Sequence, residues 1–474
     1  MTNKLPLING IKNYIDENNI PFSMPGHKCG RGFEQTEEGR KFLEDIIDYD
    51  ITEVDGVDNL HSPEGIIKES LDLLKEFYGS KKSYYLVNGS TSGNLAMIFS
   101  VFNEGDKIIV ERNCHRSIYN AIILRKLKPI YISSKINDKY QLPISIDNDM
   151  FDSILEENKD AKGIVITYPN YYGICCDLEH IVKRARKYKM KVLVDSAHGA
   201  HFKCNDKLPK DALEAGADIV VQSSHKTLSS FTQTAYLHVN HNINIDKVDF
   251  YVSTFLSTSP SYLLMASMEY GRFLMEEQGQ RNYDELIRLC KVYRERINEL
   301  SIFHIIDKED LPNNIDLDES RYIINVNKGY SGHKLLDYLR ENNIQCEMSD
   351  NRNVLAIFSA FNKEKDVLKL YEVLSKCNIK LLEDNIDIKI LENVNPTMKL
   401  LPYEVINMEY KSINFKKALG MVCYKSIVPY PPGIPLLMPG EVIDENIIKS
   451  LEYYIDNNVT ILGLENENIY VVEQ

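Results

Sequence analysis

The sequence lacks the features on which three classes of protein depend. It carries 55 Lys and Arg against 69 Asp and Glu, a net charge of −14, whereas nucleic-acid-binding proteins usually present a basic face. No stretch approaches the roughly 18 consecutive apolar residues of a membrane-spanning helix, and the opening Met1–Lys4 begins no recognisable secretion signal. We therefore expect neither nucleic acid nor a membrane as partner, although an acidic surface can attract cationic substrates.

Tryptophan is also absent, and the nine cysteines show no metal-binding spacing. No two of them have the two-residue gap of a zinc ribbon, and an odd number in a long chain favours reduced thiols over a disulfide framework. Hydrophobic residues make up 43% and charged residues 26% of the 474 residues, close to ordinary globular values. We expect a folded cytoplasmic protein with a large core.

Short β-rich segments alternate with longer helical segments after about residue 63. The expected strands are Ser83–Val87, Lys107–Glu111, Pro129–Ser133, Gly163–Thr167, Lys191–Asp195 and Asp218–Gln222, and the expected helices include Ile66–Tyr78, Thr91–Phe102, Ser117–Lys126 and Leu178–Tyr188. Such alternation predicts an α/β fold with a mainly parallel sheet covered by helices. The carboxyl ends of its strands would share one edge, where ligands usually bind.

The second half of the chain predicts a smaller unit. Leu264–Leu300 has the pattern of a long helix, and the segments Arg321–Val326, Lys334–Glu341, Val354–Ser359 and Lys365–Ser375 alternate between strand and helix. We divide the chain into an N-terminal segment (1–62), a large domain (63–300) and a C-terminal part with the smaller α/β domain (301–474).

The segment Asp218–Lys226 joins a buried strand to reactive side chains. A lysine at a strand end is most often a surface residue, but an amine in a dry pocket can lose its proton and attack an aldehyde. The hydroxyls of Ser223 and Ser224, next to Lys226, suit a phosphate group.

The strand Lys191–Asp195 ends at a carboxylate, and His198 and His201 follow it. Asp195 could cap a loop, or it could bind a metal together with the two histidines. No other carboxylate–histidine cluster supports the metal, so we expect none. In the alternative that we favour, Asp195 pairs with a protonated pyridine nitrogen and keeps the ring able to accept electrons.

Two further segments follow strands. Asn88–Asn94 opens a helix, where exposed N–H groups favour an anion; its Ser90, Thr91 and Ser92 are also ordinary N-cap types. The lysine of a nucleotide-binding Walker A loop is missing. His115 could cap the next helix or stack on a cofactor ring.

The order of these segments along the chain indicates a fold family more specifically than any single segment does. An anion cradle, a flat ring, a carboxylate and a lysine follow successive strands, and Asp195 precedes Lys226 by 31 positions. In this order the large domain resembles that of the fold-type I (aspartate aminotransferase-like) enzymes that use pyridoxal 5'-phosphate (PLP).

The chain as a whole resembles the Orn/Lys/Arg decarboxylase family, major group, in its short bacterial form. The motifs that carry the resemblance are Met24–Lys28, Asp50–Glu53, Asp58–Gly65, Asn88–Asn94, Tyr168–Gly173, Asp195–Phe202, Ser223–Lys226, Ser257–Tyr262 and Pro429–Glu441. They span residues 24 to 441, nearly the whole chain.

The resemblance implies a role for each candidate residue. Lys226 holds PLP as a Schiff base, Asp195 binds the pyridine nitrogen, and His115 stacks on the ring. His198 lies near the phenolic oxygen of the ring or near the substrate. The phosphate neighbours are Ser90, Thr91, Ser92, Ser223 and His225, with Thr258 reaching from a neighbouring subunit, which implies a homodimer or larger homo-oligomer. Glu441 is the candidate that binds the distal cation of the substrate.

The chain departs from the family pattern in two places. Its first family motif begins at residue 24, which leaves no room for the N-terminal wing domain of large members, so assembly into large rings through that domain is not expected. Many short members have a glutamate after the cofactor aspartate, where this chain has Ser196. Asp195 and His198 are retained, so we expect activity.

The implied function is PLP-dependent decarboxylation of a basic L-amino acid in polyamine synthesis. Arginine, lysine and ornithine all remain open, and arginine is favoured by analogy with short family members. Two other functions remain open as well. The first is another fold-type I activity, an aminotransferase or lyase, in which Arg352 would clamp the substrate carboxylate. The second is a non-catalytic PLP-binding protein.

Overall fold

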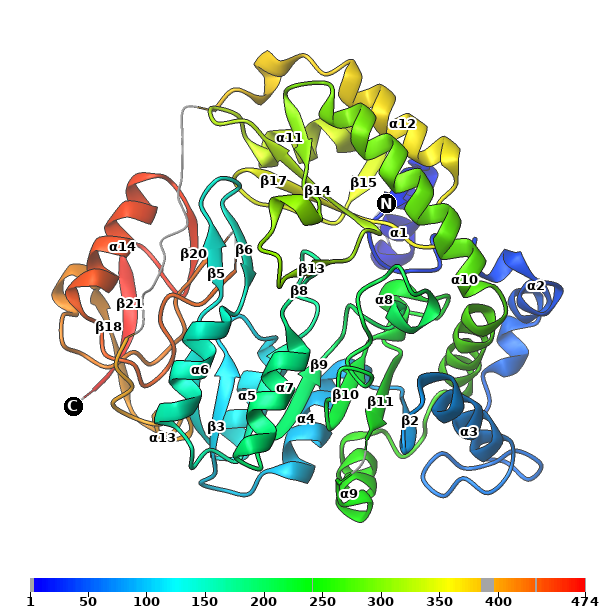
Figure 1. Ribbon diagram of the computed structural model, residues 1–474, viewed down its shortest axis with the longest axis horizontal. Coiled ribbons are helices and arrows are strands. Elements are labelled where there is room, and N and C mark those ends of the chain that lie inside the picture. The colour runs from blue at the N-terminus through cyan, green and yellow to red at the C-terminus, as the bar shows by residue number, and fades with distance from the viewer. Residues whose placement is uncertain (1–3, 241, 385–395, 431–432, 474) are drawn as a thin grey trace.

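A seven-stranded sheet organises the large domain (Figure 1). The computed structural model describes residues 4–240, 242–384, 396–430 and 433–473, so Pro431 and Pro432 of the Pro429–Glu441 motif lie outside it. In spatial order the strands are β2 (Lys82–Leu86), β11 (Ala235–Val239), β10 (Ile219–Gln222), β9 (Lys191–Asp195), β7 (Gly163–Thr167), β3 (Lys107–Glu111) and β4 (Lys128–Ile132). Those from β10 to β4 are parallel, which confirms the predicted α/β fold with a mainly parallel sheet.

The central strands are apolar along their length because both faces of the sheet are covered. Ile108–Val110, Val192–Val194 and Ile219–Val221 are fully buried. Asp195 is in register with Thr167 on one side and Val221 on the other. The polar residues that follow these strands therefore meet at one edge.

Helices pack around this sheet largely where the sequence predicts them. They are α3 (Ile66–Tyr78), α4 (Gly89–Val101), α5 (Arg116–Leu124), α6 (Asn148–Glu157), α7 (Leu178–Lys187) and α9 (Ile245–Phe255). α4 contacts α5 and α9, whereas α6 contacts α7. α3 ends at Gly79, whose φ of +69° is the left-handed conformation that glycine adopts readily.

The antiparallel strand β11 was not among the predicted strands. It runs against both β2 and β10. Its sequence is short and contains His238, which weakens the apolar pattern. In the structure His238 is fully buried, and its Nδ1 lies 2.8 Å from Oγ of Ser83 on β2, whereas its Nε2 is buried without a hydrogen-bond partner among the described residues.

The long helix α10 (Tyr262–Asn298) leads from the large domain to a four-stranded antiparallel sheet. That sheet contains β12 (Phe303–Ile305), β14 (Arg321–Val326), β17 (Asn353–Ile357) and β16 (Met348–Ser349), accompanied by α11 (Gly332–Glu341) and α12 (Glu364–Ser375). β1 (Ile20–Phe22) of the N-terminal segment pairs in parallel with β15 (Ile344–Cys346). Within the described ranges, no helix combines the length and apolar character needed to cross a membrane.

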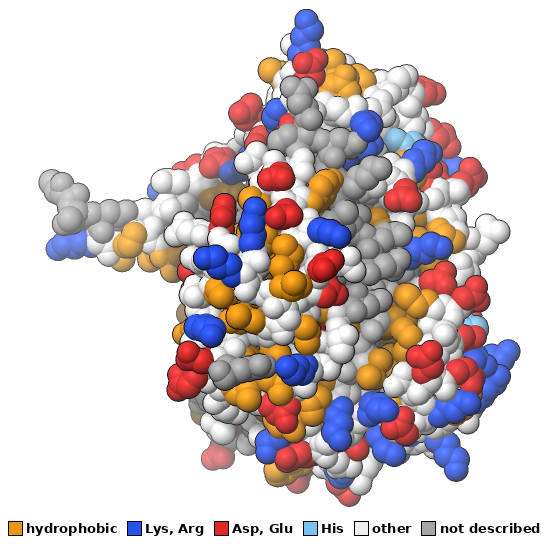
Figure 2. All heavy atoms as spheres, turned by 90° about the vertical axis from the view of Figure 1, so that its left-hand side faces the viewer, with side chains coloured by type: hydrophobic (Ala, Val, Ile, Leu, Met, Phe, Trp, Pro, Cys, Tyr) orange, Lys and Arg blue, Asp and Glu red, His pale blue; other side chains and the backbone are white. Residues whose placement is uncertain are grey.

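Residues 415–471 have a hydrophobic core of their own. It is built around the helix α14 (Glu445–Asp456) and two pairs of strands. In the first pair β18 (Tyr410–Asn414) runs beside β21 (Asn468–Val472), and in the second β19 (Val428–Tyr430) runs beside β20 (Thr460–Leu462). This unit lies at the left of Figure 1 and faces the viewer in Figure 2, where charged side chains of both signs alternate with apolar ones. The separate hydrophobic core that includes the large domain has Leu382 as its last buried residue in the described structure.

Candidate active site

Three predicted residues follow strands that end at one edge of the sheet. Asp195 is the last residue of β9, and α8 (Ser224–Thr227), which contains Lys226, starts two residues after the neighbouring β10. His115 caps the N-terminus of α5, which follows β3. The parallel order of the strands thus gathers residues that are far apart in the sequence.

Lys226 has an unusual environment for a lysine. Its Nζ lies 3.0 Å from Nε2 of His198. Burial lowers the pKa of Lys226; the charge of Asp195 opposes this shift, Arg321 adds to it and Glu347 opposes it. A lowered pKa increases the fraction of uncharged amine, the form that attacks an aldehyde.

Asp195 is held by two hydrogen bonds and is only 1% exposed. Its Oδ2 accepts from Nδ2 of Asn94 at 2.8 Å, and its Oδ1 accepts from the backbone N–H of Ala197 at 3.1 Å. A buried carboxylate is costly without a cationic partner. The position therefore suits a protonated nitrogen of a bound ring.

Asn94 and Ser117 connect Asp195 to His115. Nδ2 of Asn94 also donates to Oγ of Ser117 at 2.9 Å. Oγ of Ser117 lies 2.8 Å from Nδ1 of His115, and the Ser117 N–H donates to the same nitrogen at 3.2 Å. Sequence reasoning missed both residues, although Asn94 stands four positions after Ser90 and so shares a face of α4 with it.

The predicted phosphate neighbours divide into different environments. The Ser92 hydroxyl donates to the Gly89 carbonyl at 2.8 Å and so serves the helix, whereas Ser90 is half-buried and Thr91 exposed. Oγ of Ser223 is buried without a hydrogen-bond partner in the described structure. An unpaired buried hydroxyl costs free energy, and an anion oxygen would satisfy it.

His225 lies half-buried beside Lys226 on α8. Its Nδ1 lies 2.8 Å from the Thr234 carbonyl. Because a carbonyl only accepts, Nδ1 carries the proton and Nε2 is left with its lone pair. Burial lowers the pKa of His225, which favours this neutral form.

Thr258 lies exposed in the loop before α10. The N–H of the adjacent Ser257 donates to Oδ1 of Asn88 at 2.9 Å, and the Ser257 carbonyl lies 2.8 Å from Nε2 of His61. The loop therefore rests on the start of α4 in its own subunit. Contact of Thr258 with a neighbouring subunit stays a prediction.

Glu441 is not a free carboxylate in this structure. It is 1% exposed, and its two oxygens accept from Nη1 and Nη2 of Arg112, both at 2.7 Å. Oε2 also accepts from the N–H of Met438 at 2.7 Å. Arg112 directly follows β3, so Glu441 joins the C-terminal unit to the large domain; binding of a substrate cation by Glu441 stays a prediction.

The other possibilities raised by the sequence find little support. His201 pairs with Asp318, its Nε2 lying 3.1 Å from Oδ2, and the described residues contain no group of three or more His, Cys, Asp or Glu side chains that could hold a metal ion. Nε of Arg352 donates to the Val326 carbonyl at 2.8 Å, at the end of β14. The arginine whose charge lowers the pKa of Lys226 is Arg321.

The N-terminal motif Met24–Lys28 packs directly against the lysine-bearing helix. The N–H of Gly26 donates to the His225 carbonyl at 2.8 Å, and a Cβ on Gly26 would lie 2.5 Å from the carbonyl carbon of Thr227. Nζ of the buried Lys28 donates to the Ile357 carbonyl at 2.9 Å. The motif thus ties α8 to the smaller sheet, a role that the sequence alone did not indicate.

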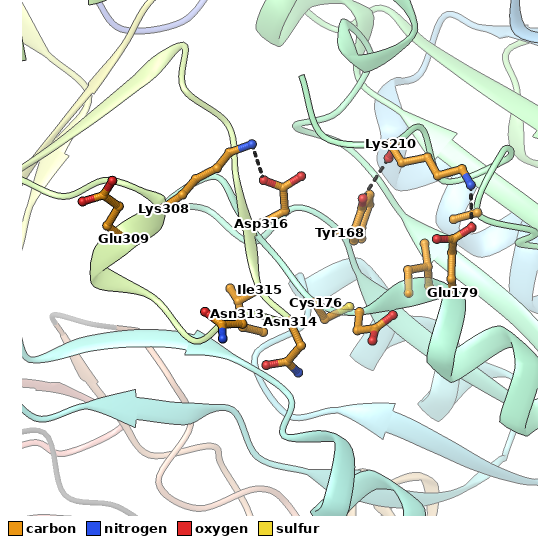
Figure 3. A pocket seen from close by; sticks show the side chains of 13 residues that line it. Tyr168, Cys176, Glu179, Lys210, Lys308, Glu309, Asn313, Asn314, Ile315 and Asp316 are labelled. Carbon is orange, nitrogen blue, oxygen red and sulfur yellow. Dashed lines mark hydrogen bonds and ion pairs between the residues drawn. The ribbon is translucent and has the colours of Figure 1, made fainter. Parts of the chain in front are cut away.

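A cavity of about 570 Å³ lies elsewhere, lined by Tyr168, Cys176, residues 308–309 and residues 313–316 among others (Figure 3). Its two labelled lysines are already paired: Lys210 with Glu179, and Lys308 with Asp316 at 2.7 Å. It contains none of the predicted site residues, so we place the candidate active site at Lys226 instead.

Comparison with known proteins identifies the family of the chain. The Orn/Lys/Arg decarboxylase major domain matches residues 5–318, and the C-terminal domain of the same family matches residues 390–468. The arginine decarboxylase of Bacillus subtilis (strain 168) is 33% identical over 98% of this chain and 97% of that protein. The inducible lysine decarboxylase of Escherichia coli (strain K12) is 23% identical over 94% of this chain and 76% of that protein.

Solved structures show the same fold. The lysine decarboxylase of Francisella novicida superposes with a TM-score of 0.79, covering 98% of this chain and 83% of that chain at 21% identity. The serine palmitoyltransferase of Sphingomonas wittichii gives 0.56, covering 75% of this chain and 86% of that chain at 15% identity. At these identities the likeness establishes the fold-type I architecture and no more.

The sequence matches, the fold and the residues at the strand ends all indicate the same protein family. The major-domain match covers most of the chain and includes Lys226 and Asp195. Arginine decarboxylases align over nearly its full length. The chain therefore belongs to the Orn/Lys/Arg decarboxylase family of PLP-dependent enzymes, which decarboxylate basic amino acids.

Proposed function

We propose that this enzyme converts L-arginine to agmatine and CO₂, with PLP attached to Lys226. The observation that carries the proposal is the placement of half-buried Lys226 and buried Asp195 at the ends of neighbouring parallel strands, with the buried, unpaired Ser223 hydroxyl close in sequence. Amine, carboxylate and hydroxyl fit the aldehyde, pyridine nitrogen and phosphate of PLP. Arginine is favoured because arginine decarboxylases are 32–33% identical over nearly the whole chain, against 23% for a lysine decarboxylase.

Each residue has a physical task in this proposal. When bound, PLP supplies a ring that accepts the electrons of the breaking bond to the carboxylate. Asp195 holds the proton on the pyridine nitrogen, and Asn94 orients Asp195. His115 lies against the ring, and His198 faces the reacting amine. The phosphate lies near Ser90, Thr91, Ser92, Ser223 and His225. The hydroxyls of Ser90, Thr91 and Ser223 can donate to it, whereas the Ser92 hydroxyl donates to Gly89 and neutral His225 donates through Nδ1 to Thr234.

Loss of CO₂ is favoured when the substrate carboxylate is poorly solvated and not clamped. A clamp would need an arginine with two parallel N–H groups available. Arg321 donates to Asp318, to the Tyr171 carbonyl and to His198. Its guanidinium is therefore committed, which supports decarboxylation over transamination.

We also propose that the enzyme acts as a homodimer or larger homo-oligomer in the cytoplasm, in polyamine synthesis. α1 (Pro6–Asp16) buries none of its residues, and Leu7, Ile8 and Ile15 are 74%, 60% and 64% exposed. Contiguous exposed apolar side chains mark association surfaces. The nine cysteines are all free, which suits a reducing compartment.

The test is CO₂ release by the purified, PLP-loaded protein, offered arginine, lysine and ornithine separately, with the amine identified. We expect agmatine and CO₂ from arginine. Lys226→Ala should abolish release and the visible absorbance of attached cofactor, whereas Lys210→Ala, in the separate cavity of Figure 3, should preserve both. Release only from lysine or ornithine would refute the substrate, and an undiminished Lys226→Ala variant would refute the cofactor site.

A further inference from the structure

Arg321 is the largest fully buried side chain near Lys226, and nothing in the sequence singled it out for the active site. It is the first residue of β14 and is 1% exposed. Its Nε donates to Oδ2 of Asp318 at 2.9 Å. Asp318 is held in turn by the Ser320 hydroxyl at 2.5 Å and by His201 at 3.1 Å. The guanidinium therefore has one fixed orientation.

The far end of that guanidinium meets His198. Nη1 donates to Nδ1 of His198 at 3.2 Å and to the Tyr171 carbonyl at 2.8 Å, while Nη2 donates to the His198 carbonyl at 3.1 Å. A guanidinium in a protein keeps its protons and has no acceptor. Nδ1 of His198 must therefore accept, so it carries no proton.

The position of the His198 proton follows from this contact. A neutral imidazole carries one proton, and the hydrogen bond at one ring nitrogen sets the state of the other. With Nδ1 accepting from Arg321, the proton lies on Nε2. A second proton, on Nδ1, would face the Nη1–H of Arg321, and burial together with the charges of Lys226 and Arg321 lowers the pKa of His198.

This N–H points at the lysine that the proposed function requires. Nε2 of His198 is 3.0 Å from Nζ of Lys226. An ammonium group has three donors and no lone pair, so it cannot accept from Nε2–H. The contact is a hydrogen bond only when Lys226 is an uncharged amine, and burial shifts the pKa of Lys226 in the same direction.

We infer that Arg321 is a positioning residue that fixes the proton of His198 on Nε2, so that His198 holds Lys226 as the uncharged amine. The inference rests on the proposed function only in taking Lys226 as the cofactor lysine; the arrangement of the proton does not depend on it. Asp318 and His201 act one step further away by orienting Arg321. Residues of the smaller sheet thereby prepare a nucleophile that belongs to the large domain.

The test measures the titration midpoint of Lys226 itself. The full-length protein, before PLP is added, is labelled with trace acetic anhydride across pH 6 to 11, and the labelled Lys226 peptide is quantified by mass spectrometry. Arg321→Gln removes the fixed donor and allows His198 to accept from an ammonium, so the midpoint should rise by about one pH unit or more. Arg294→Gln, another buried arginine, makes no contact with His198 in the described structure and should leave it unchanged.

A double-variant cycle separates action through His198 from the direct effect of removing a charge. In a His198→Phe background, Arg321→Gln should shift the midpoint much less. An equal shift in both backgrounds, or none in either, would overturn the inference.

The wild-type protein offers a second measurement that needs no variant to fold. With ring-¹⁵N-labelled histidine, Nε2 of His198 should be the protonated nitrogen near neutral pH, and a proton on Nδ1 would overturn the inference. If Nε2 carries the proton but PLP never attaches to Lys226, the proposed function fails and this inference stands.

Discussion

Asn94 connects two residues that are proposed to bind the cofactor. Its amide donates to Asp195 at 2.8 Å and to Ser117 at 2.9 Å, which uses both of its N–H groups. Ser117 in turn contacts His115 at 2.8 Å. The carboxylate proposed to hold the pyridine nitrogen and the ring proposed to stack on the cofactor are therefore aligned by one residue of α4.

Asn94→Ala should weaken PLP binding. It removes a hydrogen bond to a charged acceptor, which contributes about 1.5–3 kcal/mol and corresponds to about 10- to 100-fold in the dissociation constant. The measurement is equilibrium binding followed by the absorbance of attached PLP. Ser100→Ala is the matched control, because Ser100 is a buried serine of the same helix whose hydroxyl, among the described residues, donates to the Met97 carbonyl at 2.9 Å and does not contact the site. Equal affinity in both variants would contradict the role of Asn94.

Some residues of the candidate site could be predicted from the sequence, and others could not. Lys226 and Asp195 each follow a recognisable buried strand, so strand order alone brings them together. Asn94 and Arg321 act on partners 101 and 123 positions away, and a local pattern carries no information about such contacts. Glu441 was recognised from its motif, but its pairing with Arg112 depends on how a separate unit docks, which periodicity does not encode.

At the scale of elements, strands and helices of the large sheet follow from hydrophobic pattern, because parallel strands covered on both faces are continuous apolar runs. β3, β7 and β9 have the predicted bounds. β11 was not predicted because His238 interrupts its apolar pattern, and the contact of His238 with Ser83 on another strand is visible only in the folded chain. The N-terminal loop escaped for a similar reason, since its contact with α8 exists only in the folded chain.

Gly26→Ala tests that contact between the N-terminal loop and α8. A Cβ would lie 2.5 Å from the Thr227 carbonyl carbon and 2.6 Å from the Leu228 carbonyl oxygen, so the backbone carrying Lys226 must move. A displacement near 1 Å can lower a reaction rate about 100-fold, and we expect such a loss in CO₂ release.

Gly10→Ala is the control for the glycine substitution, because no atom of the described residues lies within 4 Å of the added atom on α1. It should retain full activity and unchanged far-ultraviolet circular dichroism. The role of Gly26 would be disproved if Gly26→Ala were as active as Gly10→Ala.

At the scale of the whole molecule, a buried ion pair joins two separately packed units. Arg112 follows a strand of the large sheet and is 3% exposed. It binds both oxygens of Glu441 and also donates to the carbonyls of Pro435 at 2.8 Å and Leu436 at 3.2 Å. Since Arg112 stands three residues before His115, the docking of the C-terminal unit bears directly on the segment that carries the ring proposed to stack on the cofactor.

Two roles for Glu441 make opposite predictions. If Glu441 mainly docks the C-terminal unit, Glu441→Gln leaves a buried guanidinium without its counter-charge, which costs about 3–5 kcal/mol. Arg112→Met should destabilise the protein similarly, and the double variant Arg112→Met, Glu441→Gln should lose less than the sum of the two. If Glu441 binds the substrate cation, Glu441→Gln should raise KM more than about tenfold in a protein that unfolds at the wild-type temperature.

The described contacts favour the docking role, because both Glu441 oxygens are already bonded to Arg112. Thermal unfolding and KM measured on the same preparations decide between the two roles. Glu452→Gln is the reference for an exposed pair: Lys416 and Glu452 lie 3.3 Å apart at the surface, and loss of such a pair costs at most about 1 kcal/mol. A Glu441→Gln variant as stable as Glu452→Gln would show that the Arg112 pair does not dock the C-terminal unit, and a raised KM in that same variant would assign the carboxylate to the substrate.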